Sequence, residues 1–189
     1  MNKGQRTLVG LAALFLAPLA IAFLIYYGQG GAGPGRQLNH GELYSPARPL
    51  HITRLTLAQG GSAGAEVFRH HWTLLFVGEG RCDARCEKAL YDTRQVRLAL
   101  DRNMLRVQRV FLASGECCRL EELRREHPDL LIARAAARDD ALLAQLPGGG
   151  GQLYLIDPLS NLVMRYGPEV PAKGLLEDLK RLLKLSQIG

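Results

Sequence analysis

The chain has 189 residues, enough for one ordinary domain with an appendage, and four of them are cysteines. Its net charge of +6 comes from 24 Lys and Arg against 18 Asp and Glu, without any basic cluster interleaved with aromatic residues. That pattern argues against nucleic-acid binding, and a mildly basic face near anionic lipid headgroups explains the excess.

The first predicted element is a membrane-spanning helix over residues 7–27, a run without any charged residue. A helix of this length measures about 31 Å at about 1.5 Å per residue, which is enough to cross a hydrocarbon core of about 30 Å. A cleaved signal peptide is the alternative, because residues 20–22 offer a small-residue cleavage site. We favour the anchor because residues 23–27 continue the apolar run and end in two tyrosines suited to the membrane interface.

The basic residues around this run predict its orientation. Lys3 and Arg6 precede it, and the next basic residue is Arg36. Because basic residues are retained on the cytoplasmic side, we predict that residues 1–6 are cytoplasmic and that residues 28–189 lie across the membrane from them.

A glycine- and proline-rich segment over residues 28–50 is predicted to be a linker that passes into an extended stretch. The folded domain is predicted to follow at residues 51–189. Within it, residues 51–57 alternate as a strand does, and the glycines of residues 60–64 turn the chain back.

From residue 72 onward the pattern is that of an α/β domain. Buried strands are predicted at residues 72–77 and 105–113, with a helix over residues 83–101 between them, which makes a right-handed βαβ unit. The later elements are predicted as a helix at 120–126, a short strand at 130–133, a helix at 139–146, a hairpin of residues 153–158 and 162–166, and an amphipathic helix at 171–185.

Cys82 and Cys86 lie where the first buried strand passes into the following helix. A spacing of four residues places two side chains on one helix face, and the first turn of a helix favours a thiolate. Two such thiols can form a disulfide or bind a soft metal ion such as Cu(I), whereas a structural zinc site needs four ligands. We interpret the pair as catalytic or metal-binding, held together and accessible at the carboxyl edge of the sheet, where such folds keep their sites.

Cys117 and Cys118 follow the second buried strand. Parallel strands of a βαβ unit end at the same edge of the sheet, so both cysteine pairs are predicted to share one rim. Four thiols there would support a dithiol relay or a multi-thiolate Cu(I) site. The alternative is an inert pair in a loop.

The order of these elements, with two cysteines at the first strand-to-helix turn, is that of a thioredoxin-like domain. Three features extend the comparison: the single anchor, the run from Trp72 into Cys82-Asp-Ala-Arg-Cys86, and Tyr154-Leu-Ile-Asp-Pro158 before the hairpin. Over residues 50–185 the chain resembles the Sco/SenC group, membrane-anchored proteins that deliver copper to cytochrome c oxidase and handle its cysteines.

Shorter stretches at residues 39–43, 48–50, 94–100 and 107–111 are similar to small proteobacterial membrane proteins related to Sco and linked with cytochrome oxidase. The resemblance implies a bacterial inner-membrane protein with a periplasmic domain, an accessory in respiratory oxidase assembly. It also implies partners among the oxidase subunits or among proteins that carry copper or thiols, with Cu(I) as the candidate metal.

The histidines depart from the Sco pattern. Sco proteins complete their copper site with a histidine shortly before the strand that corresponds to residues 153–157, where this chain has Gly149 in a run of glycines. His127 precedes a proline and is predicted to be an exposed loop residue rather than a ligand. His70 and His71 precede the first buried strand, at the edge opposite the cysteines.

Two other functions stay open. The domain can be a thiol-disulfide oxidoreductase with other substrates, although thioredoxin-type enzymes usually carry Cys-x-x-Cys and a facing cis-proline, and this chain has three intervening residues and a glycine run. It can also be a Sco-like subunit that docks on a membrane complex and does no chemistry.

Overall fold

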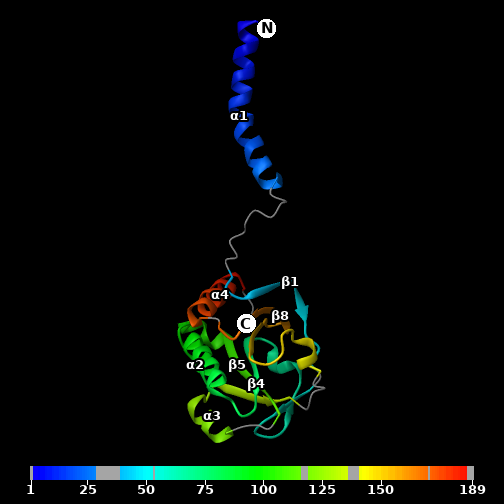
Figure 1. Ribbon diagram of the computed structural model, residues 1–189, viewed down its shortest axis with the longest axis vertical. Helices are drawn as coiled ribbons and strands as arrows, with labels where there is room; N and C mark the ends of the chain where they lie inside the picture. Colours follow the sequence, from blue (N-terminus) through cyan, green and yellow to red (C-terminus); the bar gives the residue numbers. More distant parts are fainter. Residues whose placement is uncertain are drawn as a thin grey trace. The chain divides into compact units, whose positions relative to one another are not determined.

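The computed structural model describes residues 2–28, 39–52, 54–115, 119–135, 141–169 and 171–186, and it divides the chain into two compact units between residues 38 and 39. The first unit contains the helix α1 (Lys3–Gly28), whose stretch Lys3–Ile25 is long and apolar enough to cross a membrane (Figure 1). The anchor predicted at residues 7–27 lies within this helix.

The described part of the second unit forms an eight-stranded mixed sheet in the order β1-β8-β7-β4-β5-β6-β2-β3. Its centre is β4, which runs parallel to β5 and antiparallel to β7, while β5 and β6 are also parallel. The strands are β1 (Glu42–Pro49), β2 (Leu55–Leu57), β3 (Ser62–Ala63), β4 (Trp72–Glu79), β5 (Val107–Ser114), β6 (Leu130–Arg134), β7 (Gln152–Ile156) and β8 (Asn161–Tyr166).

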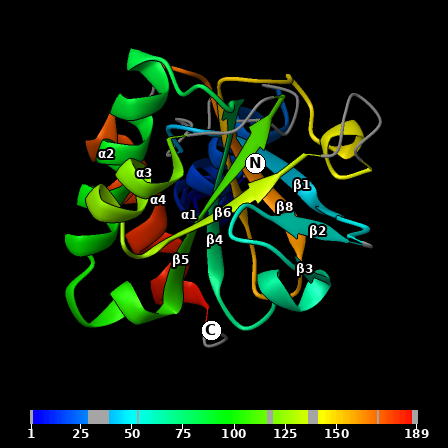
Figure 2. The ribbon, with the colours of Figure 1, turned by 90° about the horizontal axis from the view of Figure 1, so that it is seen from below.

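Three helices cover one face of this sheet (Figure 2). They are α2 (Ala84–Leu98), α3 (Leu120–Glu126) and α4 (Ala172–Leu185). Side chains alternate along β4, so Leu74 and Phe76 pack under the helices, whereas Leu75 and Val77 join the core on the opposite face. That opposite face is closed by Leu50, Leu55, Phe68, Leu142 and Leu146 and by two short 3-10 turns, η1 (Ala65–Phe68) and η3 (Leu143–Gln145).

A buried arginine ties α2 to the sheet. Arg109 of β5 is only 1% exposed, and its guanidinium donates to the Leu90 carbonyl and to Thr93 Oγ1, both on α2. Its Nη1 also lies 3.1 Å from Asp129 Oδ1, at the start of β6. Because a buried charge is tolerated only when paired and hydrogen-bonded, this network fixes the position of α2 over β5.

A second buried acid holds the beginning of the unit against its last helix. Asp178 Oδ2, on α4, accepts hydrogen bonds from the backbone N–H groups of His40 and Gly41 and from the Tyr166 hydroxyl. Burial raises the pKa of the Tyr166 hydroxyl far above its ordinary value, and the negative charge of Asp178 raises it further. The residues just before β1 are therefore part of the fold.

Three features of the fold differ from the sequence-based expectations: a unit boundary, a strand and a helix. The second unit begins at Asn39 rather than at residue 51, because the segment predicted as extended linker forms the edge strand β1 on β8. The strand predicted at residues 51–57 is confined to β2, where three residues pair with β6 and β3. Of the helix predicted at residues 139–146, the described part contains only the short turn η3.

Candidate functional site

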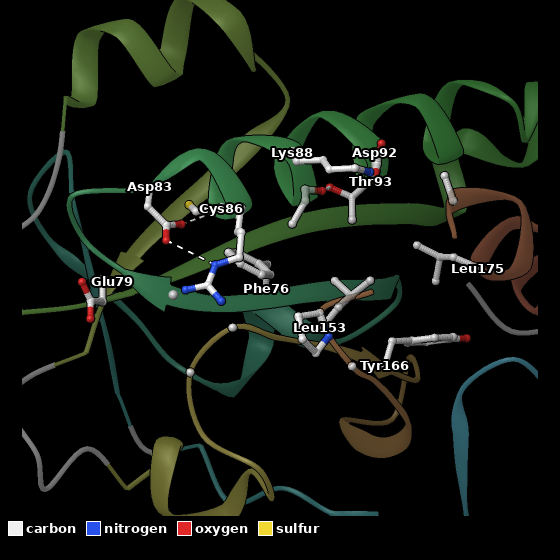
Figure 3. A pocket seen from close by; sticks show the side chains of 18 of the residues that line it. Phe76, Glu79, Asp83, Cys86, Lys88, Asp92, Thr93, Leu153, Tyr166 and Leu175 are labelled. Carbon is white, nitrogen blue, oxygen red and sulfur yellow. Dashed lines mark hydrogen bonds and ion pairs between the residues drawn. The ribbon is translucent and has the colours of Figure 1, made fainter. Parts of the chain in front are cut away.

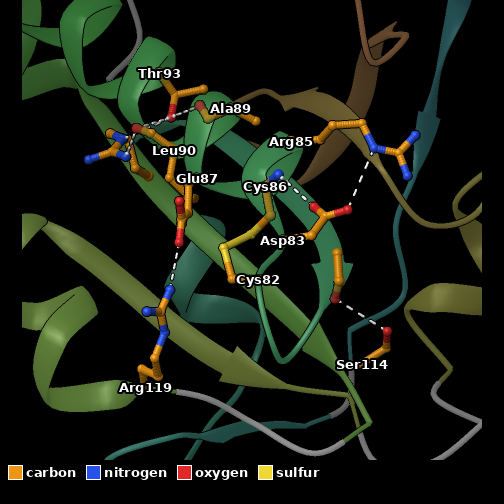
Figure 4. The surroundings of a disulfide bond; sticks show 12 residues. Cys82, Asp83, Arg85, Cys86, Glu87, Ala89, Leu90, Thr93, Ser114 and Arg119 are labelled. Atoms are coloured by element: carbon orange, nitrogen blue, oxygen red, sulfur yellow. Dashed lines mark hydrogen bonds and ion pairs between the residues drawn. A yellow bond between two sulfur atoms is a disulfide. The ribbon is translucent and has the colours of Figure 1, made fainter.

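The site begins where β4 ends and α2 starts, and there Cys82 and Cys86 form a disulfide with a Cα–Cα distance of 5.1 Å (Figure 4). Cys82 lies just before the helix, in the left-handed region with φ of 47°, and its N–H donates to the carbonyl of Glu79. Cys86 lies in the first helical turn. The prediction that the two sulfurs are held together is confirmed, although only one of the two cysteines belongs to the helix.

Asp83 stands between the cysteines and caps α2. Its Oδ1 accepts from the Cys86 N–H at 3.0 Å, which satisfies one of the free N–H groups at the helix start. This hydrogen bond is the main cause that lowers the pKa of Asp83, and the neighbouring Arg85 adds to it. The cap thus sets the direction in which α2 leaves the cysteine turn.

Both sulfurs are covered by the surrounding chain. Cys82 is 5% exposed and Cys86 is 3% exposed, so the expectation that they are accessible on the surface is wrong for this oxidised state. The physical reason is that the turn folds inward: both side chains join the apolar core under α2, together with Phe76, Leu90 and Leu123.

Within the described part of the chain, two hollows of very different size are lined by the two cysteines, one by each. The cavity lined by Cys86 has a volume of about 320 Å³ and runs between α2, α4 and the strands β4, β7 and β8 (Figure 3). The cleft at Cys82 has a volume of only about 10 Å³. Since one water needs roughly 10–15 Å³, the cleft is too small for an incoming side chain. Of these two hollows, only the larger one, beside Cys86, has room for an incoming side chain.

An ion pair closes the side of Cys82. Arg119 lies 2.5 Å from Glu87 on α2 (Figure 4). It also lies 3.2 Å from Glu122 on α3. At the same rim, the Ser114 hydroxyl at the end of β5 donates to the Gly78 carbonyl of β4. Cys117 and Cys118 lie between these two flanking residues but outside the described residues, so their predicted place on the rim stays a prediction.

The histidines do not complete a metal site. His127 is 5% exposed, so the prediction that it is an exposed loop residue is wrong. It packs at the end of α3, where burial, followed by the positive charge of Arg109, lowers its pKa. His70 and His71 stand at the start of β4, opposite the edge where the cysteines lie. Among the described residues, no cluster of three or more His, Cys, Asp or Glu side chains can hold a metal ion.

The Cys82–Cys86 pair itself fits Cu(I) only as a two-sulfur site. In the reduced state two soft thiolates can bind Cu(I) linearly. Gly149, near the place of the Sco histidine, has φ of 72° in the turn before β7, and its carbonyl accepts from the Tyr154 hydroxyl. The residues present therefore offer two donors for copper and, within the described chain, no third.

The Arg109 network is not among the features predicted from the sequence. The signal was available, because a strand covered on both faces rarely contains an arginine unless a partner is buried with it. Its partners Thr93 and Asp129 lie 16 and 20 residues away, and no local pattern points to them.

The family described as "Transmembrane-like, thioredoxin-like, C-terminal domain" matches residues 72–186. No curated protein matches the sequence significantly.

Solved structures share the fold at low identity. Apo Sco1 from Thermus thermophilus is 19% identical with a TM-score of 0.62, over 76% of this chain and 96% of that one. Yeast Sco1 with copper bound is 15% identical with a TM-score of 0.62, over 73% and 94%. BsSco, named as a member of the Sco family of cytochrome c oxidase assembly proteins with a disulfide switch, is 10% identical with a TM-score of 0.57, over 74% and 96%.

At these identities the similarity to the solved structures shows the fold alone. The matched family model covers more than half of the chain. The predicted thioredoxin-like α/β fold with an apolar N-terminal helix is confirmed, as is the resemblance to Sco. The chain belongs to the transmembrane-like, thioredoxin-like C-terminal domain family and carries the fold of the Sco proteins.

Proposed function

We propose that this protein is a membrane-anchored, Sco-like accessory factor for respiratory cytochrome c oxidase assembly, and that Cys82 and Cys86 exchange their disulfide with thiols of a partner. The observation that carries the proposal is the disulfide itself, placed at the turn from β4 into α2 of a thioredoxin-like fold. Ligand and redox sites of open α/β sheets lie at this carboxyl edge.

The exchange is a two-electron transfer. A partner thiolate attacks one sulfur, a bond forms between partner and protein, and the Cys82–Cys86 bond breaks, so that the other cysteine leaves as a thiolate. A second partner thiolate then attacks the mixed disulfide and leaves the partner oxidised. Two protons pass from the partner thiols to the two cysteines, and the partner loses the two electrons that the protein gains.

The first turn of α2 assists this step. Cys86 lies at the helix start, where the unpaired N–H groups and the helix dipole stabilise a negative sulfur. The Asp83 carboxylate already accepts a hydrogen bond from the Cys86 N–H, and Arg85 offsets the negative charge of Asp83. The helix start therefore favours a thiolate at Cys86, whereas the burial of this sulfur among apolar side chains opposes it.

With Lys3 and Arg6 before the apolar helix, residues 1–6 are cytoplasmic and the folded domain faces the periplasm of a bacterial inner membrane. The partners are oxidase subunits or a protein that carries copper or thiols. Cys117 and Cys118 are a second thiol pair for the same relay.

The test uses the full chain in its bacterial host, with the Cys82→Ser, Cys86→Ser double variant in place of the wild type. We expect the level of assembled cytochrome c oxidase, measured by its visible spectrum and by cytochrome c oxidation, to fall although the variant accumulates normally. Ser62→Ala, which removes an exposed hydroxyl on β3 and lines neither the cavity nor the cleft at the cysteines, is the control. Normal oxidase in the double variant would refute the chemical role and leave only a docking role.

Copper handling is the second candidate, favoured by the two adjacent sulfurs and by the solved copper-bound structures of the same fold. The reduced full chain in detergent, titrated anaerobically with Cu(I), is expected to bind one equivalent. Each single serine variant is expected to lose that binding. Equal binding by the double serine variant would place copper elsewhere and remove this candidate.

A further inference from the structure

The cavity beside Cys86 is larger than packing defects in a domain of this size. Protein interiors are packed like organic crystals, with few voids larger than a water molecule, whereas this one measures about 320 Å³. That volume lies at the lower end of the roughly 300–1,000 Å³ typical of ligand sites. It therefore suits one or two side chains better than a large cofactor.

The inner wall of the cavity is mainly apolar. Phe76, Leu153, Tyr166 and Leu175 form it together with Ala89 of α2, so that α2, α4 and three strands each contribute (Figure 3). Water inside such a wall finds few polar partners, and an apolar group gains by replacing it.

Among the described charged residues that line the mouth of the cavity, one acid has no basic partner. Asp83 pairs with Arg85 at 3.5 Å, and Lys88 pairs with Asp92. Glu79, at the end of β4, lines the same cavity and, among the residues that the structure describes, has no ion-pair partner. The rim thus favours a cationic group beside an apolar one.

The mouth also leaves room for a polypeptide backbone. Gly150 and Gly167 line it, and a Cβ atom added at either position meets no atom within 4 Å. An extended chain can lie over these glycines while one of its side chains enters the cavity.

We propose that this cavity is the recognition subsite for the thiol partner, and that it takes an apolar side chain next to the partner's cysteine while a basic residue of the partner faces Glu79. This inference rests on the proposed thiol exchange and names the chemistry of its substrate: an extended segment with an apolar and a basic residue flanking cysteine. Seating that side chain brings the partner's sulfur to the opening that Cys86 lines.

The test measures how fast short peptide thiols reduce the oxidised full chain in detergent micelles. Three acetylated tripeptide amides are compared, with cysteine in the middle: leucine and lysine as flanks, leucine and glutamate, or serine and lysine. Acid quenching and mass spectrometry follow the mixed disulfide. At low salt we expect the leucine–lysine peptide to react about tenfold faster than the serine–lysine one, and several-fold faster than the leucine–glutamate one.

Three variants of the protein assign these preferences to the cavity. Ala89→Leu fills the wall, and Gly167→Leu blocks the mouth at a position with open space; in either variant the leucine-to-serine rate ratio is expected to fall toward one. In Glu79→Gln the lysine-to-glutamate ratio is expected to fall toward one. Glu121→Gln, on the exposed face of α3, is the matched control and keeps both ratios.

Reduction by dithiothreitol distinguishes a failure of the recognition subsite from a failure of the thiol exchange. If it reduces the wild-type disulfide while the three peptides react equally, the subsite is refuted and the exchange function stands. If neither dithiothreitol nor any peptide reduces the pair, the exchange function fails and the subsite fails with it. Peptide preferences that persist unchanged in both cavity-filling variants would also refute the subsite.

Discussion

Arg109→Met tests whether the buried arginine network holds α2 in place. The change keeps most of the side-chain stem and deletes the guanidinium, so Leu90 O, Thr93 Oγ1 and Asp129 lose a donor. Each hydrogen bond contributes about 1 kcal/mol, and breaking a buried ion pair costs about 3–5 kcal/mol. Water partly replaces the lost partner of Asp129, whose side chain is 25% exposed, so we expect a loss near the lower end, about 3 kcal/mol.

The assay is urea unfolding of the full chain in detergent, followed by the fluorescence of Trp72, the one tryptophan, which is buried on β4. With a denaturant slope of about 2 kcal/mol per molar urea, the expected loss lowers the midpoint by about 1.5 M. Arg102→Met, at an exposed position, is the control and is expected to change stability by less than about 0.5 kcal/mol. An Arg109→Met midpoint as high as that of the control would refute the idea that this network anchors the cysteine helix.

Three further predictions use the same unfolding assay. Burial lowers the pKa of His127 in the folded state, so in mild acid the unfolded chain binds a proton at this histidine more readily than the folded chain does. The folded state therefore has its full stability above the ordinary histidine pKa of about 6.5 and loses stability as the pH falls below that value. Wild type should therefore lose more stability than His127→Leu between about pH 7.5 and about pH 5, and equal losses would contradict this. Asp178→Asn weakens three hydrogen bonds and should cost about 1–3 kcal/mol, whereas Glu177→Gln, exposed on the same helix, should cost under about 0.5 kcal/mol. Reducing the Cys82–Cys86 bond reopens a loop of sequence separation 4, and the chain-entropy estimate for so short a loop is about 2 kcal/mol, so the midpoint should fall on adding dithiothreitol to wild type and stay unchanged in the double serine variant.

The sequence was sufficient for the central elements because their signals are local. The apolar run from Trp72 became β4, and the periodic leucines near the end became α4. The cysteines were placed correctly at the first strand-to-helix turn for the same reason.

What failed depends on contacts distant in sequence. The stretch that contains Pro46 looks unlike a strand, yet β1 forms because an edge strand needs partners on one side only, and β8 supplies them. The burial of His127 and of the two sulfurs depends on how α3 and α2 pack, which no pattern within either helix encodes.

A histidine placed in the glycine turn before β7 tests whether this turn can complete a three-ligand copper site with Cys82 and Cys86. Gly150 lines the same cavity as Cys86, lies outside the left-handed region and has open space at its Cβ position, so Gly150→His can offer an imidazole there without backbone strain. Gly149 has φ of 72°, so Gly149→His starts from a strained conformation and serves as the comparison.

If the turn lies within reach of the reduced pair, a third ligand should raise Cu(I) affinity by at least about tenfold in Gly150→His, measured by competition with a colorimetric Cu(I) chelator. The gain should vanish when Cys86→Ser is added. An unchanged affinity would mean that the glycine turn lies too far from the sulfurs to complete a three-ligand copper site.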